Sequence, residues 1–165
     1  MSNGKNMSLK GRFKLQLFSK DGVLKAEQEF NNAITDVGMN HILETQFNGG
    51  TPVTAWYMGL VNNASWTAFA NADTMSSHAG WIEATAYAES TRPEWTAGTA
   101  SARSITNSAT VDFSINATIT LKGIFITSNS TKSGTTGVLW NTAAFASNVS
   151  AINGDVLRLT YTVSG

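Results

Sequence analysis

The chain has 165 residues and no cysteine, so it is long enough for one domain with a buried core and excludes both a disulfide framework and a thiolate metal site. Charged residues make up only 13% of the chain, with 11 basic side chains against 11 acidic ones, whereas Ser, Thr and Asn fill 53 positions. This composition favours a structural or binding protein with a hydroxyl- and amide-rich surface over an enzyme that concentrates titratable groups at one site.

The N-terminal segment carries the only charge bias, with six basic residues and one acidic residue in the first 25 positions. We expect residues 1–11 to form a flexible basic arm and residues 12–165 to form a single β-sandwich domain. The arm is either solvated or docked on an acidic surface. No nucleic acid is expected, because aromatic residues are not interleaved with the basic ones and no binding motif follows.

The first elements are two strands joined by a tight turn. Phe13, Leu15 and Leu17 alternate with polar residues, which predicts a half-buried strand. Asp21-Gly22 is typical of a hairpin turn, and residues 23–30 are expected to return as its partner strand.

A helix is predicted for residues 35–47. Either Thr35 or Asp36 can cap its N-terminus, and Asn48-Gly49-Gly50 is expected to end it. The apolar positions expected to face the core are Val37, Met39, Ile42, Leu43 and Phe47.

The rest of the chain alternates strands with long polar loops. Gly123 interrupts an apolar run and indicates a bulge or a close backbone approach. The further strands are predicted at residues 53–61, 81–87, 104–116, 118–127, 138–145 and 156–163. About eight strands and one helix predict an all-β fold, an antiparallel β-sandwich of jelly-roll type with one short helix and long loops.

Two groups of residues have the side chains that a catalytic or metal site needs. Glu83, Glu89 and Glu94 are close in sequence, but a solvated sheet face explains them more simply than a glycosidase pair. Asp73 and His78 share one loop, where an Asx turn and a hydrogen bond across the loop base explain them better than a triad or a metal site. We therefore expect no catalytic residue, no metal and no cofactor.

Two tryptophans, Trp66 and Trp95, lie in predicted loops. Each is either a lid packed on the sandwich or an exposed anchor for another subunit or a sugar ring. No apolar run is long enough to cross a bilayer and no signal peptide precedes the first strand, so we expect a soluble chain made in a cytoplasm without a membrane partner.

Several segments together resemble small bacteriophage virion proteins built as β-sandwiches, including capsid cement (decoration) proteins and some tail-associated proteins. The segments are Asn32–Gly38, Trp56–Val61, Asp73–Glu83, Tyr87, Arg92–Trp95 and Gly154-Asp155.

The resemblance implies a non-enzymatic cement protein that lies on the outer surface of the capsid and bridges major capsid subunits. Its partners would be the major capsid protein and further copies of itself, as a homodimer or homotrimer. The alternative is a tail or fibre component that binds host-surface glycan through Trp66 or Trp95. The candidate interface residues are Lys5, Lys10, Arg12, Lys14, Trp66, Phe69, Arg92 and Trp95.

Overall fold

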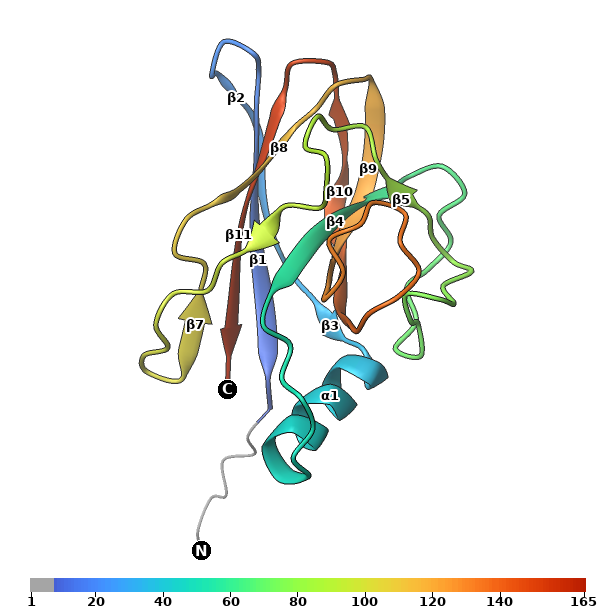
Figure 1. Ribbon diagram of the computed structural model, residues 1–165. Helices are drawn as coiled ribbons and strands as arrows, with labels where there is room; N and C mark the ends of the chain where they lie inside the picture. The colour runs from blue at the N-terminus through green and yellow to red at the C-terminus, as the bar shows by residue number, and fades with distance from the viewer. Residues whose placement is uncertain (1–7) are drawn as a thin grey trace, which may run out of the picture.

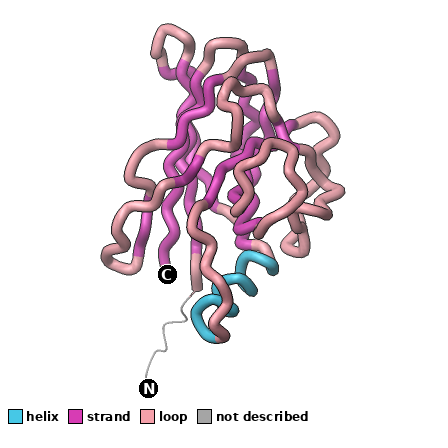
Figure 2. Tube along the Cα trace, viewed as in Figure 1, coloured by secondary structure: helices cyan, strands magenta, loops and turns pink. Residues whose placement is uncertain are grey.

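The computed structural model describes residues 8–165 and is built mainly of strands, with one helix in that range (Figures 1 and 2). Two antiparallel sheets pack against each other, so the predicted β-sandwich is confirmed. The jelly-roll connection pattern stays a prediction. Lys5 and most of the predicted arm lie outside the described residues.

The first sheet has the strand order β2-β1-β11-β7, and β8 also pairs with β11. Its strands are β1 (Lys10–Phe18), β2 (Leu24–Asn31), β7 (Ser104–Thr106), β8 (Val111–Ser114) and β11 (Val156–Ser164).

The second sheet has the order β3-β10-β9-β4-β5, and β6 also pairs with β4. Its strands are β3 (Ala33–Ile34), β4 (Trp56–Asn62), β5 (Glu83–Ala84), β6 (Glu94–Trp95), β9 (Ile119–Thr127) and β10 (Leu139–Ala151).

Strand β1 sits in the middle of the first sheet and shows how its sequence sets its orientation. Phe13, Leu15 and Leu17 are buried, while the residues between them face outward, as the alternation predicts. The turn at Asp21-Gly22 also forms, with Gly22 at a φ of 77°. Lys10 and Gly11 pair with the end of β11, so these two positions belong to the sheet and not to the arm.

The second sheet is buried on both faces. Met58 and Leu60 point into the space between the sheets, whereas Val61 and Phe125 belong to a second apolar cluster on the opposite face. The loop residues Met75 and Trp81 and Leu139 of β10 complete that cluster. Val37 of the helix and the loop residues Trp66 and Phe69 pack against it. Because both faces are covered, residues 58–61 of β4 and 123–127 of β9 are buried at successive positions, whereas buried and outward positions alternate in β1.

The helix α1 (Asp36–Phe47) forms within one residue of its prediction. Thr35 caps it, because the Thr35 hydroxyl accepts a hydrogen bond from the Gly38 amide at 3.1 Å. The helix crosses β10 closely at Gly38, where a Cβ atom would lie 2.5 Å from the Trp140 carbonyl oxygen. The predicted apolar stripe is wrong for Leu43 and Phe47, which face solvent.

Three predicted strands have different limits. The predicted strand 104–116 is split into β7 and β8, because the Asn107 side chain donates to the carbonyls of Ala109 and Leu159 and accepts from the Tyr161 amide. Of residues 81–87, only Glu83–Ala84 are in a strand, whereas β10 continues past residue 145 to Ala151.

Candidate functional site

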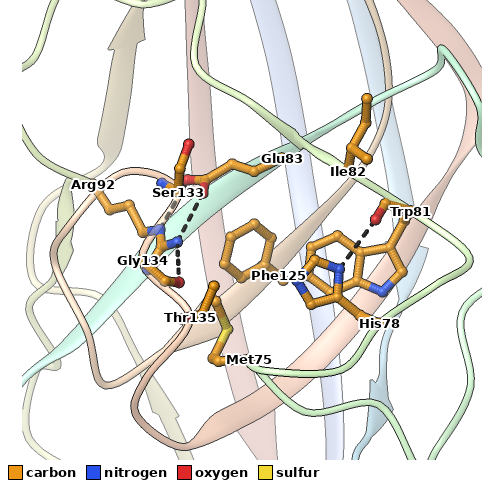
Figure 3. A pocket seen from close by; sticks show the side chains of 10 residues that line it. All are labelled: Met75, His78, Trp81, Ile82, Glu83, Arg92, Phe125, Ser133, Gly134 and Thr135. Carbon is orange, nitrogen blue, oxygen red and sulfur yellow. Dashed lines mark hydrogen bonds and ion pairs between the residues drawn. The ribbon is translucent and has the colours of Figure 1, made fainter.

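A hollow of about 220 Å³ opens on the covered face of the second sheet (Figure 3). Its floor is Phe125 of β9, and an ion pair lies at one end and a stacked His–Trp pair at the other. The residues that line it are Met75, His78, Trp81, Ile82, Glu83, Arg92, Phe125, Ser133, Gly134 and Thr135.

The ion pair joins Arg92 to Glu83 through two parallel hydrogen bonds, from Nε at 2.8 Å and from Nη2 at 2.7 Å. The Arg92 side chain is completely buried and that of Glu83 is 7% exposed. Arg92 also donates to the carbonyl oxygens of Asn129 and Gly134, and its guanidinium lies 5.1 Å from the centre of the Phe125 ring. Four donated hydrogen bonds and a ring contact fix this side chain in place.

The same pair holds the loop of residues 128–138 against the sheet. Glu83 accepts a third hydrogen bond from the Ser133 amide at 2.7 Å, and Ser133 has a φ of 57°. Lys132 donates to the Tyr87 carbonyl and lies 3.8 Å from the centre of the Tyr87 ring. Burial, and next the nearby Glu83 carboxylate, raise the pKa of the Tyr87 phenol. The charges at this end of the hollow therefore act as a structural clamp.

At the other end, His78 stacks on Trp81 with ring centres 3.9 Å apart. Its Nδ1 lies 3.0 Å from the Trp81 carbonyl oxygen, so it bonds across the base of the loop. Asp73 accepts from the Ala70 amide at 3.0 Å and from the Trp81 indole at 2.9 Å. The predicted hydrogen bond of His78 across the loop is confirmed. Asp73 caps a backbone amide as expected, but the amide belongs to Ala70, three residues earlier, and not to the predicted Asx turn. The prediction that Glu83 is solvated is wrong.

Within residues 8–165, no three His, Asp or Glu side chains gather closely enough to hold a metal ion. Over the same range, the helix is too short and too polar to span a membrane.

The first sheet presents a second candidate site, an outer face without any covering layer in the described residues. This outer face is mainly polar because most large apolar side chains of β1 and β11 take the inward positions. Phe18 and Val156 lie at one end of the outer face, where the Arg158 guanidinium lies 5.2 Å from the centre of the Phe18 ring. Its residues are Lys10, Arg12, Lys14, Gln16, Glu27, Glu29, Asp112, Arg158, Thr160 and Thr162.

Charges on the outer face are paired across neighbouring strands. Arg12 pairs with Glu29, Lys14 lies 3.1 Å from Glu27, and Arg158 donates twice to Asp112. Hydrogen bonds from Lys14, first, and from Gln16 lower the pKa of Glu27. Threonine hydroxyls continue the surface beside β1, with Thr162 3.0 Å from Thr106. The result is a nearly neutral surface rich in hydrogen-bonding groups.

The structure separates the predicted interface residues within residues 8–165 into three groups. Lys10, Arg12 and Lys14 share the outer face, as strand alternation implies. Arg92 is buried inside the chain at 1% exposure, so its side chain offers no surface to a partner and its assignment as an interface residue is corrected. Trp95 is 8% exposed and reaches the surface only as part of the wall of a groove.

The loop residues Trp66 and Phe69 pack on the sandwich as a lid, which was one of the two alternatives for Trp66; the other was an exposed anchor. They contact each other edge to face at 6.1 Å, and Lys122 lies 4.6 Å over the Trp66 ring. Neither Trp66 nor Trp95 is an open platform on which a sugar ring could stack.

Sequence reasoning missed the contribution of β11 to the outer face. Arg158, Thr160 and Thr162 alternate with buried Leu157, Leu159 and Tyr161, and that alternation was a visible signal that they face solvent. The pairing of β11 with β1, which places them beside Lys14, depends on contacts about 140 residues apart and has no local signal.

Comparison of the chain with models of protein families and with curated proteins found no match.

Proposed function

We propose that this chain is a non-enzymatic structural protein of a phage virion, a cement protein that binds the outer surface of the capsid and bridges major capsid subunits. The observation that carries the proposal is the outer face of the first sheet. It is the one sheet face left uncovered within the described residues, while the second sheet is covered on both sides.

The chemistry of that face suits attachment to protein. Its exposed ion pairs and hydroxyls can exchange water for partner groups, and neutral polar groups cost less to desolvate than unpaired charges. Lys10 is exposed at the edge of this face and has no ion-pair partner within residues 8–165, which suits an acidic patch on the shell.

The hollow supports a structural role for its charged residues. Glu83 and Arg92 hold each other and three backbone groups, so the polar groups that a reaction would need are engaged in holding loops. The segments that resemble virion proteins include this pair and the Asp73–Trp81 contact, so the resemblance covers the parts that build the fold.

The test uses capsids assembled without this chain, to which the purified chain is added in increasing amounts. We expect saturable binding at a fixed ratio to the major capsid protein, and a higher temperature for release of the packaged DNA. Absence of binding at saturating concentration, with capsid stability unchanged, would exclude a cement role. Removal of residues 1–7 in a parallel sample measures how much the segment containing Lys5 adds.

A further inference from the structure

A groove of about 290 Å³ lies between helix α1 and the end of the sandwich, at the end where the chain terminates (Figure 1). Its walls include three tryptophans contributed by β4, β6 and β10. The apolar residues that matter here are Ile42, Val53, Trp56, Trp95, Ile105 and Trp140.

Two features show that this end of the molecule is incomplete by itself. Phe47, at the last position of α1, is 83% exposed, and Leu43 one turn earlier is 48% exposed. The Trp95 side chain forms part of the groove wall, and its buried Nε1–H has no hydrogen-bond partner in the described structure. An exposed apolar ridge therefore lies beside an apolar groove that holds an unsatisfied donor.

Charges at this end are complementary. Helix α1 carries Asp36 and Glu44 and has no basic residue in its last turn. Arg103 lies directly before β7, whose Ile105 lines the groove, and its carbonyl accepts from the C-terminal Gly165 amide. Within residues 8–165 neither Glu44 nor Arg103 takes part in an ion pair.

From these observations we infer that the groove binds a second copy of this chain, with Phe47 of each copy inserted into the tryptophan groove of the other. A ridge and a groove on one surface can satisfy each other reciprocally about a two-fold axis. The same arrangement brings Glu44 of one copy toward Arg103 of the other.

Sedimentation or light scattering over a concentration series measures the association. The wild-type chain is expected to be dimeric, and Phe47→Ser is expected to weaken dimerisation by about 100-fold or more, because two buried phenyl rings are lost per dimer. The matched control is Ile152→Ser, an equally simple truncation of an exposed apolar side chain in the turn between β10 and β11, at the other end of the sandwich. It should leave the dimer intact.

A charge exchange tests the arrangement without touching apolar residues. Glu44→Arg alone and Arg103→Glu alone should each weaken the dimer, since each places like charges opposite one another. The double variant should restore it. A wild-type chain that stays monomeric at about 100 µM, a Phe47→Ser chain that dimerises normally, or a double variant no better than the singles would overturn the inference.

This inference rests on the proposed function, because a cement protein is expected to bind further copies of itself and the groove is the surface that we assign to that contact. Because the mass is measured without capsids, the dimer can fail while capsid binding holds, or the reverse.

Discussion

The two sheets of this sandwich differ in how their outer faces are covered and in where their charged side chains lie. In the second sheet, loops cover the outer face, so successive residues of β4 and β9 are buried and the ion pair of this face, Arg92–Glu83, is buried as well. In the first sheet, one face is apolar and the other carries exposed pairs such as Arg12–Glu29. We propose that the two sheets have different tasks, stability for the covered one and binding for the exposed one.

The same chemistry has different consequences in the two places. A buried ion pair has lost its water, so removing one partner leaves an uncompensated charge in a dry site. An exposed pair exchanges readily with water and contributes little to stability. Exposed charges are therefore free to take part in recognition, whereas Arg92 is not.

The largest effect is expected from Arg92→Ala. It leaves Glu83 buried without its counter-charge and frees the loop of residues 128–138, so the free energy of unfolding should fall by about 3–5 kcal/mol. Urea denaturation measures this value. The comparison variant Arg12→Ala, on the exposed face, should cost less than about 1 kcal/mol. Equal losses of unfolding free energy in the Arg92→Ala and Arg12→Ala variants would contradict the difference between a covered and an exposed sheet.

A smaller loss of unfolding free energy is expected from Tyr161→Phe, which weakens the contact between the two sheets. The Tyr161 hydroxyl receives hydrogen bonds from the side chains of Asn32, Trp140 and Asn141 at 2.8–3.0 Å. Removing this oxygen leaves three buried N–H donors without their shared acceptor, so the free energy of unfolding should fall by about 1–3 kcal/mol. Thermal unfolding of the variant measures the loss, and a melting temperature equal to that of the wild type would contradict this reading of the network.

The smallest expected effect is a pH dependence of stability that arises from Glu27 on the outer face. The pKa of Glu27 lies below its ordinary value of 4.5, chiefly because Lys14 hydrogen-bonds to it. The contribution of this contact to stability is therefore fully present above that value and is lost as the pH falls through the lowered pKa. An NMR titration of the Glu27 carboxyl should show its pKa rising toward the ordinary value in Lys14→Gln. An unchanged pKa would mean that the contact is absent in solution.

Local sequence signals predicted the exposed sheet better than the covered one. The alternation around Phe13 and Leu15 and the Asp21-Gly22 turn each act within a few residues, and both formed as predicted. The start of α1 was also predicted locally, and of the two possible caps, Thr35 and Asp36, the structure uses Thr35. In the covered sheet, the short apolar run of residues 124–126 in β9 was a signal that both faces of the sheet are covered.

The partners within the cover could not be predicted. Glu83 and Arg92 meet because a loop about 40 residues further along folds over both, and nothing near either residue encodes that path. The exposure of Phe47 was missed for a related reason, since the close approach of Gly38 to β10 turns the other side of α1 toward the sandwich.

The central claim is that the outer face of the first sheet binds the shell while the covered sheet supports it. The most direct test counts copies per capsid for Thr160→Arg, which places a bulky charge in the middle of that face beside Lys14, against Ala64→Arg in the exposed loop that follows β4. Both variants should fold with wild-type stability. We expect the first to leave capsids largely unoccupied and the second to bind normally; full occupancy by the Thr160→Arg chain would contradict the account.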